Sequence, residues 1–557
     1  MIKALLNIKV KLLPNERGYY MKFAVLSDTH YISRRMIANP DDKELMLQPA
    51  VTEQAIMQAS QEADVLFITG DLTDCGDCYS HEDFSDFLRK IKLRGKKIYV
   101  IFSTHDYNHH KAFARKYGEK VRYKSQPWEK PWFSSESIRW HDYVTDEFSN
   151  LSESECIPQL VEPLSPEKIW EIYREFGPDE AYSVHESSFS YCLDLDESTR
   201  CLMLNDGFRN EECLRDKSAS YSPACFRWIE QMYREAKRDG KFIFVCSHHP
   251  LVPPAPAYRI GAGKENRDMR SPAPGHDLAD IGINLAFTGH THFCDVGYLK
   301  SEKGNLLCDI TVPSVRFYPP AYRLVDLDGN AGRIKYNCTY INIPQGFEIK
   351  EDSLFEHYHR EMYNQYYRSI TGSNTALKKL LDKTKVKDVY FIVKNKAKLS
   401  ESEYQSIKET KVFDLIIEIA FNMLIGDGRF NPGTPEYKFM MSLSAKLDSI
   451  IDTQPFIDVR KKYLGGYSVS QVIEPMLYNK SVSDREAEFD FTQMPKSTDT
   501  APVYTSHAGE AVMGFVYAAA IMLSALYPAA AAVGIPLLTL RKKLKEKKRT
   551  PEPTLKY

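Results

Sequence analysis

The sequence predicts an α/β fold, because short apolar runs typical of buried strands alternate with amphipathic stretches typical of helices. Five of these apolar runs lead directly into Asp or His residues. In open α/β sheets the carboxyl ends of the strands form the edge where ligands bind. After about residue 351 a helical pattern replaces the alternation. We therefore expect an α/β domain with polar groups at one sheet edge, followed by a mostly α-helical domain.

The composition is that of a multidomain globular protein. Hydrophobic residues make up 43% and charged residues 27% of the 557-residue chain. At roughly 100–200 residues per domain, this length predicts about two to four domains. The formal net charge of −2 gives no sign of a nucleic-acid partner, and none is expected. The scattered cysteines favour a reducing compartment, and residues 1–20 lack the apolar core of a secretory signal.

The first three strand ends carry carboxylates and imidazoles. The run 23–26 is followed by Ser27-Asp28-Thr29-His30, the run 65–68 by Thr69-Gly70-Asp71, and the run 98–102 by Ser103-Thr104-His105-Asp106. Helices predicted at 49–63 and 81–93 connect these strands as βαβ units, so their carboxyl ends share one edge. Carboxylate and imidazole are suitable ligands for a divalent transition-metal ion.

Two later strands end in histidines. The run 241–247 is followed by His248-His249-Pro250, and the run 283–287 by Thr288-Gly289-His290-Thr291-His292. A lone histidine at a strand end is more often a hydrogen-bonding residue than a ligand. Five such strand ends in succession instead predict a shared metal centre. A strand pair at 188–206 and a hairpin around 328–330 complete the domain.

The order of these motifs resembles the signature of the calcineurin-like metallophosphoesterases, which is Asp-x-His, Gly-Asp, Asn-His-Asp, His and Gly-His-x-His. The matching residues here are Asp28-Thr29-His30, Gly70-Asp71, Thr104-His105-Asp106, His248 and Gly289-His290-Thr291-His292. The resemblance covers residues 21–345, and the most similar branch is the class III cyclic nucleotide phosphodiesterase-like group. It implies a four-layer sandwich of two mixed β-sheets flanked by helices. It also implies a hydrolase of phosphoester bonds, either a phosphodiesterase or a phosphomonoesterase.

The resemblance further implies a dinuclear metal centre and a set of ligands. The implied ligands are Asp28, His30 and His292 for one ion, His248 and His290 for the other, and Asp71 as the bridge. Two divalent transition-metal ions, Mn, Fe or Zn, would supply a metal-bound hydroxide. By the same resemblance, His105 would protonate the leaving group or stabilise its developing charge. Asp106 would orient the ring of His105.

One position departs from this signature. The family has Asn before the substrate-facing histidine, whereas this chain has Thr104. A hydroxyl is a poorer metal ligand than an amide carbonyl, so Thr104 is a doubtful ligand of the second ion. The second site is then weaker, filled by water, or completed by another residue such as Asn108, His109 or His110. His249 is expected to face substrate or a neighbouring side chain. The alternative function is a membrane-tethered, non-catalytic binding protein for phosphate ligands.

Three further segments are predicted before the C-terminus. Residues 107–181 are rich in aromatic residues and form either a cap over the metal centre or a small subdomain with its own core. Residues 351–490 predict a helical domain of unknown role around an apolar helix at 412–425. Residues 491–510 predict a linker.

Residues 511–540 contain no charged residue and exceed the ~20 positions needed to cross a bilayer. They predict a transmembrane helix or a re-entrant hairpin, and residues 541–557 form a basic tail. The positive-inside rule places that tail in the cytoplasm, and a hairpin would keep the catalytic domain on the same side. We therefore expect a membrane-anchored enzyme with a cytoplasmic catalytic domain. Its substrate would be a small phosphoester, either a nucleotide or a lipid-linked phosphate.

Overall fold

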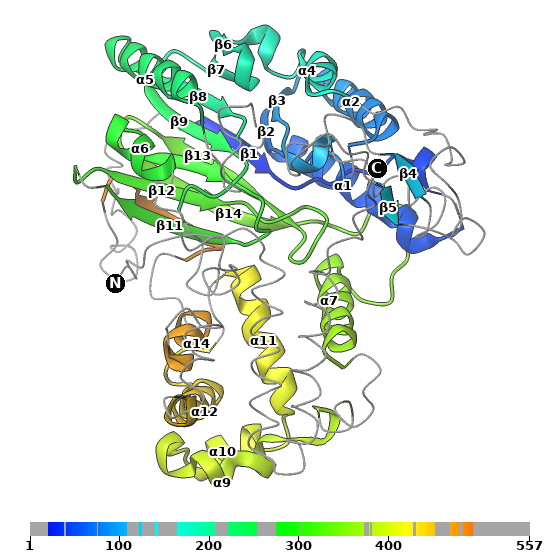
Figure 1. The fold of residues 1–557 in the computed structure, drawn as a ribbon, viewed down its shortest axis with the longest axis vertical. Coiled ribbons are helices and arrows are strands. Elements are labelled where there is room, and N and C mark those ends of the chain that lie inside the picture. Colours follow the sequence, from blue (N-terminus) through cyan, green and yellow to red (C-terminus); the bar gives the residue numbers. More distant parts are fainter. Residues whose placement is uncertain are drawn as a thin grey trace, which may run out of the picture.

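The computed structural model describes most of the chain between residues 21 and 493 (Figure 1). The described residues are 21–37, 41–74, 76–107, 122–124, 140–142, 164–206, 221–252, 274–301, 303–371, 378, 381–426, 430–451, 468–477 and 483–493.

The first sheet has six strands in the order β15-β14-β13-β1-β2-β3. These strands are β1 (Met21–Leu26), β2 (Val65–Thr69), β3 (Lys97–Ile101), β13 (Ala321–Asp328), β14 (Arg333–Tyr340) and β15 (Glu486–Asp490). β1, β2 and β3 are parallel, whereas β13, β14 and β15 add to them in antiparallel fashion. Because the first three strands are parallel, the residues that follow them emerge at one edge of this sheet.

The second sheet has seven strands in the order β11-β12-β10-β9-β8-β7-β6. These strands are β6 (Ser183–His185), β7 (Ser190–Asp194), β8 (Thr199–Leu204), β9 (Phe242–Ser247), β10 (Leu285–Thr288), β11 (Asp295–Lys300) and β12 (Leu306–Thr311). β8, β9, β10 and β12 run parallel at its centre. Their carboxyl ends therefore also share an edge.

The two sheets face each other and helices cover their outer faces. Between the sheets, the ring of Phe23 lies 5.3 Å from Phe67, 5.7 Å from Phe244 and 5.5 Å from Phe287. Figure 1 shows α1 (Lys43–Glu62), α2 (Cys78–Lys92) and α4 (Pro166–Tyr173) on one side, and α5 (Pro223–Arg238) and α6 (Pro274–Ile281) on the other. The predicted arrangement of two mixed sheets flanked by helices is confirmed.

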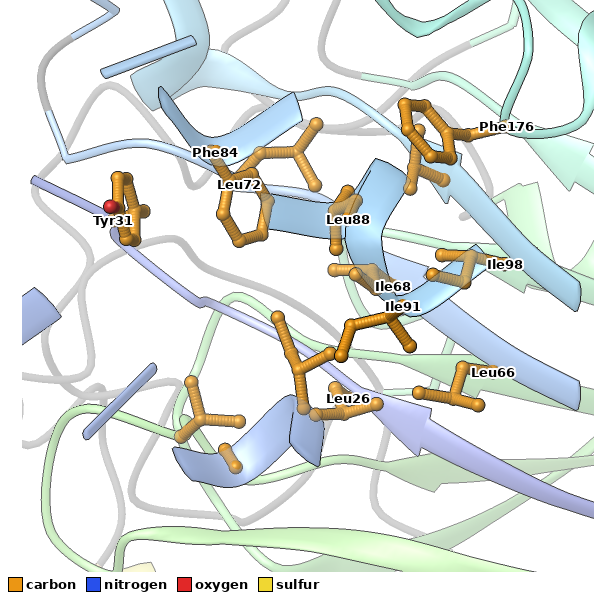
Figure 2. Close-up of a cluster of buried hydrophobic side chains, with 14 of the residues drawn as sticks. Leu26, Tyr31, Leu66, Ile68, Leu72, Phe84, Leu88, Ile91, Ile98 and Phe176 are labelled. Atoms are coloured by element: carbon orange, nitrogen blue, oxygen red, sulfur yellow. The ribbon is translucent and has the colours of Figure 1, made fainter. Parts of the chain in front are cut away.

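A buried apolar layer joins α2 to the first sheet. Phe84, Leu88 and Ile91 recur at helical spacing on one face of α2, and all three are at most 1% exposed. Figure 2 shows them gathered against Leu26, Leu66, Ile68 and Ile98 of the strands. Burying each such side chain contributes about 1.5–3 kcal/mol. Tyr31 and Leu72 belong to the same layer, so it also fixes the loops that follow β1 and β2.

Both connecting helices begin earlier than the sequence predicted. α1 begins at Lys43 rather than Pro49, because the Asp42 side chain accepts hydrogen bonds from the backbone N–H groups of Glu44 and Leu45. α2 begins at Cys78 rather than His81, because Asp77 caps it in the same way. In both helices the aspartate at the N-cap therefore determines the residue at which the helix begins.

The end of the predicted insertion 107–181 belongs to the core. Ile169, Tyr173 and Phe176 are buried in the same apolar cluster as α2 and β3. Residues 164–181 are therefore neither a cap nor a separate subdomain, because their apolar side chains complete the outer layer. A short hairpin of β4 (Arg122–Lys124) and β5 (Trp140–Asp142) is described within the rest of the insertion. The remainder of 108–163 lies outside the described residues.

The predicted helical region contains six α-helices among the described residues, gathered below the two sheets in Figure 1. They are α7 (Leu354–Thr371), α9 (Val386–Ala397), α10 (Glu401–Ile407), α11 (Val412–Ile425), α12 (Pro435–Ile451) and α14 (Val469–Leu477). The apolar helix α11 lies in their shared core, as expected. The region ends before residue 490, because 486–490 form edge strand β15. Ala487 and Phe489 alternate with acidic residues and pack against the core between the sheets.

No helix in the described part of the chain is long and apolar enough to cross a bilayer. The predicted membrane segment 511–540, the basic tail 541–557 and most of the predicted linker lie outside the described residues.

Candidate metal centre

The side chains at the carboxyl ends of β1, β2, β9 and β10 meet at one place between the two sheets. Ligand atoms lie within 4.8 Å of one another in four overlapping sets, which are Asp28–His30–His292, Asp28–Asp71–His248, His248–His249–His290 and His30–Asp74–His105. We call Asp28, His30 and His292 the first group, and Asp71, His248 and His290 the second group. The structure thus brings all six predicted ligands into one continuous centre.

The carboxylates of Asp28 and Asp71 connect the two groups. Asp28 Oδ1 lies 3.3 Å from His292 Nε2 and 3.8 Å from His30 Nε2. The same Oδ1 atom lies 4.0 Å from His248 Nε2. Asp71 Oδ2 lies 3.2 Å from His248 Nε2 and 4.0 Å from His30 Nε2. Asp71 therefore stands between the first and second groups.

Four buried atoms at this place have no hydrogen-bond partner in the structure, namely His30 Nδ1 and the three that face the centre, Asp28 Oδ1, His30 Nε2 and His248 Nε2. A buried polar atom without a partner costs about 1–3 kcal/mol. A divalent cation would satisfy the three that face the centre, because carboxylate oxygen and imidazole nitrogen are its usual ligands. The donor set therefore fits transition-metal ions.

The backbone at the predicted ligands has an uncommon conformation. Left-handed φ angles occur at Asp28 (51°), His30 (40°), Asp71 (48°), His290 (66°) and His292 (60°). This conformation costs roughly 1–2 kcal/mol per non-glycine residue. Such strain concentrates at functional sites, where it aims side chains that an ordinary turn would point elsewhere.

The motif glycines allow the two sheets to approach at the centre. A Cβ atom on Gly70, which has a φ of 96°, would lie 2.7 Å from His248 Nδ1. A Cβ atom on Gly289 would lie 1.8 Å from Ser27 Oγ and 2.6 Å from Asp28 Oδ2. Since neither contact is possible for real atoms, each glycine keeps one strand end next to a ligand from the other sheet.

Neighbouring groups hold the first group in place. Asp28 Oδ2 accepts hydrogen bonds from Ser27 Oγ at 2.6 Å and from the backbone N–H of His290 at 2.9 Å. His30 Nδ1 lies 3.5 Å from Asp74 Oδ1, which leaves Nε2 facing the centre. The ring of Phe317 stacks on His292, with centroids 4.9 Å apart and an interplanar angle of 8°.

Different groups hold the second group. His248 Nδ1 lies 2.8 Å from the carbonyl oxygen of Thr69, so its Nε2 atom faces the centre. The buried carboxylate of Asp309 accepts hydrogen bonds from the backbone N–H groups of Leu251 and Val252 at 2.7 and 2.9 Å. It also accepts one from Thr288 Oγ1 at 2.7 Å. Asp309 therefore ties the loop after His248 to the end of β10.

The charges within the centre favour binding a cation. Burial raises the pKa of Asp28 and Asp71, but the surrounding histidines outweigh it and hold both values below the usual range. Burial, with His105 nearby, lowers the pKa of His30 to about 3. Burial also opposes protonation of His248, yet Asp71 and Asp28 raise its pKa to about 10. The metal-free centre therefore carries two ionised carboxylates and a protonated His248, whose proton an ion would displace.

Asp106 does not orient the ring of His105, contrary to the prediction. Its buried carboxylate accepts hydrogen bonds from the backbone N–H groups of Ser103, Leu72 and Thr73 at 2.7, 3.2 and 2.8 Å. Consecutive residues of the short helix η2 (Thr104–Tyr107) point in different directions, so adjacency in sequence did not bring the two side chains together. Asp106 instead ties η2 to the loop after β2.

The ring of His105 is held by Asp74. His105 Nδ1 lies 2.9 Å from the carbonyl oxygen of Asp74, and the His105 backbone N–H donates to Asp71 Oδ1 at 3.0 Å. Its ring lies 4.7 Å from that of His30. His105 thus borders the first group and remains partly exposed. The side chain of Thr104 and all of Asn108, His109 and His110 lie outside the described residues.

The sequence prediction missed three carboxylates that support the centre. Asp206 follows the apolar strand β8, which is the same strand-end signal that pointed to Asp28 and Asp71. Asp309 stands within a buried strand, where an unpaired carboxylate is rare. Asp74 lies in a turn and carries no comparable signal.

Comparison with known proteins agrees with this geometry. The family model described as calcineurin-like phosphoesterase matches residues 21–294. A search of curated proteins gives no match.

Two solved structures are similar to the chain. A dimetal phosphatase from Danio rerio has 12% sequence identity and a TM-score of 0.32, with 57% of this chain and 96% of that chain covered. A purple acid phosphatase from yellow lupin (Lupinus luteus) seeds has 10% identity and a TM-score of 0.33, with 60% of this chain and 53% of that chain covered. On the strength of the family match, residues 21–294 form a calcineurin-like phosphoesterase domain, the catalytic domain of a phosphoester hydrolase.

Proposed function

We propose that the centre binds two divalent transition-metal ions, Mn, Fe or Zn, and hydrolyses a small phosphomonoester or phosphodiester. The observation that carries this proposal is the meeting of Asp28 Oδ1, His30 Nε2 and His248 Nε2 as buried atoms without hydrogen-bond partners. Asp28 belongs to two neighbouring donor sets, and His248 links the set that contains Asp71 to the set with His290, so the donors lie as close together as two cations require.

In this proposal the first group holds one ion, the second group holds the other, and Asp71 bridges them. When bound, the ions would neutralise phosphate charge and lower the pKa of a coordinated water. The protein's part is to fix the ligands. Ser27 and the backbone of His290 hold Asp28, while the backbone N–H of His105 holds Asp71.

His105 is the proposed general acid. Its Nδ1 atom faces the carbonyl of Asp74, so Nδ1 carries a proton and Nε2 is the atom left to face substrate. From there it can give a proton to the leaving oxygen or hydrogen-bond its developing charge. The second imidazole beside it, His30, has its Nε2 atom within 4.0 Å of the carboxylates of Asp28 and Asp71 and would serve the ion instead.

The test is hydrolysis of bis-p-nitrophenyl phosphate with added Mn²⁺ by the full chain and by the variants Asp71→Ala and His105→Ala. We expect both variants to lose most of the activity. The matched control is His185→Ala, because His185 lies on edge strand β6 with its Nδ1 atom 2.8 Å from Ser188 Oγ. Equal background rates for all four proteins with Mn²⁺, Fe²⁺ and Zn²⁺ would support the non-catalytic binding protein instead. Mono- and diester panels of nucleotides and lipid phosphates then define the substrate.

We further propose, from the sequence, that residues 511–540 anchor the enzyme to a membrane with the catalytic domain on the cytoplasmic side. The support is the absence of charge over these residues followed by the basic tail. Vesicle flotation of the full chain, compared with a chain ending at residue 510, tests this anchor. Equal flotation of the two proteins would rule it out.

A further inference from the structure

We infer that His249 is a protein ligand of the second ion and replaces the amide that the family signature has at the position of Thr104. The inference rests on the proposed two-ion centre and deepens it. It assigns a metal-binding role to His249, which we expected from the sequence to face substrate or a neighbouring side chain.

The position of His249 supports this role. One ligand atom from each of His248, His249 and His290 lies within 4.8 Å of the others, although His249 was not among the predicted ligands. The ring of His249 lies 4.2 Å from the ring of His290 and 5.0 Å from that of His248. Three imidazoles thus gather at the second group, and the Nε2 atom of one of them, His248, lies 3.2 Å from Asp71 Oδ2.

The orientation of the His249 ring matches that of His248, which is a predicted ligand. Its Nδ1 atom lies 2.9 Å from Asp206 Oδ1, so Nε2 is the nitrogen left for an ion. His248 shows the same arrangement with the Thr69 carbonyl, whereas His30 Nδ1 lies 3.5 Å from Asp74 Oδ1 without a hydrogen bond. A carboxylate or carbonyl at one ring nitrogen is the usual support for a histidine that binds metal through the other.

Asp206 is itself held by a buried chain of hydrogen bonds. Its Oδ2 atom accepts from the His249 backbone N–H at 2.9 Å and from Ser247 Oγ at 2.7 Å. Ser247 Oγ in turn lies 2.8 Å from the hydroxyl of Tyr221. The side chain of Asp206 is 0% exposed and that of His249 is 13% exposed. His249 is therefore held through its backbone N–H and its Nδ1 atom, while its side chain stays partly exposed. This arrangement suits a metal ligand better than that of a surface histidine.

This assignment changes the chemistry of the second group. An imidazole in place of an amide gives three nitrogen ligands and one carboxylate, counting Asp71. Nitrogen-rich sites favour Zn²⁺, Fe²⁺ and Co²⁺ over Mn²⁺ more strongly than oxygen-rich sites do. The second group should therefore prefer Zn²⁺, Fe²⁺ and Co²⁺ to Mn²⁺. The first group, with Asp28 and only two histidines, should show a weaker preference.

The test measures ion binding rather than activity. The metal-free full chain is titrated with Co²⁺ by calorimetry, with the visible spectrum recorded at each step. We expect two Co²⁺ ions per wild-type chain. In His249→Ala the first ion should bind as before, and the second should bind at least about tenfold more weakly with a changed spectrum. Asp206→Asn should weaken the second ion by roughly 10–100-fold, while the control His185→Ala should match wild type.

Every other result of this titration decides whether His249 is a ligand of the second ion. Unchanged affinity and spectrum for the second ion in His249→Ala overturn the assignment, as does a wild-type chain that binds only one ion. If His249→Ala lacks a cooperative thermal transition, His249→Gln is measured instead and judged by the same result. A wild type that needs His249 for its second ion but hydrolyses no phosphoester would refute the proposed function and leave this ligand assignment standing.

Discussion

The two groups of the centre differ in how completely the motifs define them. The first group takes its three residues from the Asp-x-His and Gly-His-x-His motifs, and each residue has the predicted identity. The second group lacks the expected amide at Thr104, yet it has an additional histidine, His249, within reach. One group therefore follows the signature, whereas the other departs from it at one donor and has a further imidazole nearby.

The supporting residues differ as well. The first group is held by Ser27 and the backbone N–H of His290, with Asp74 beside His30. The second group is held by the Thr69 carbonyl and the His105 backbone N–H of the first sheet, and the buried carboxylates of Asp206 and Asp309 support its neighbours on the second sheet. The comparison teaches that a ligand motif specifies the ion-facing atoms, while the residues behind it decide which nearby imidazole can serve as a further ligand.

Asp71→Asn should give the largest effect, because it should weaken ion binding in both groups. An amide cannot supply the negative charge that holds two cations together, so both groups lose affinity and hydrolysis falls to the rate of the metal-free protein. Metal content after dialysis and the rate on a chromogenic diester measure this. The matched control is Asp86→Asn on the surface of α2, where the carboxylate is 61% exposed. Two tightly bound ions in Asp71→Asn would contradict the bridging role.

His105→Ala should separate chemistry from ion binding. Loss of a general acid typically costs about 10²–10⁴-fold in rate, so kcat should fall by that factor. Both ions should still bind, because the His105 contact to Asp71 comes from the backbone N–H and survives the substitution. Rate measurements beside a Co²⁺ titration check this. An ion affinity that falls in parallel with kcat would make His105 part of the first group instead.

The prediction from sequence succeeded where a short pattern determines geometry. Parallel strands place their carboxyl ends at one edge, so Asp28, Asp71 and His248 could be brought together without coordinates. Prediction failed where neighbours in sequence diverge in space, as with His105 and Asp106. His249 does face a neighbouring side chain, one of the two predicted options, but the sequence could not name that neighbour as Asp206, since nothing local to either residue encodes the other. The edge strand β15 was missed because it follows a helical region and pairs with residues about 150 positions earlier.

His81→Gln should make the free energy of unfolding less dependent on pH in the acidic range. Burial lowers the pKa of His81 from 6.5 to about 4, and its Nε2 atom lies 2.6 Å from the carbonyl oxygen of Asp106. Between these pH values the unfolded chain binds a proton that the folded chain does not, so the free energy of unfolding decreases as the pH falls. The gap corresponds to roughly 3 kcal/mol at most.

Chemical denaturation of wild type and His81→Gln between pH 4 and pH 7 isolates this contribution, because the other titrating groups are common to both proteins. The wild-type stability should fall more steeply below pH 6.5, and the variant's curve should be flatter. Parallel curves would show that His81 is not the neutral buried group that supports the loop of His105.

Thr104→Asn should make the two groups more alike. The amide carbonyl would restore the donor of the family signature, so the second ion should bind about tenfold more tightly, a change of about 1.4 kcal/mol. Affinity for the first ion should stay the same. A Mn²⁺ titration is the most sensitive measurement, because an added oxygen ligand favours the harder ion. Thr104→Ser is the matched control, and equal tightening in that variant would argue against an amide-specific effect.

The smallest expected effect concerns the first group and the ring that covers it. Phe317 stacks on His292 with centroids 4.9 Å apart, and such a pair contributes about 0.5–1.5 kcal/mol. Phe317→Leu keeps an apolar side chain but removes the stacking, so affinity for the first ion should fall by roughly 2- to 10-fold. The second group, which Phe317 does not support, should bind its ion as before. Calorimetric titration with Co²⁺ resolves the two steps. A matching loss at the second step would mean that the groups are coupled through Asp28 and Asp71, and the comparison between them would then describe one site rather than two.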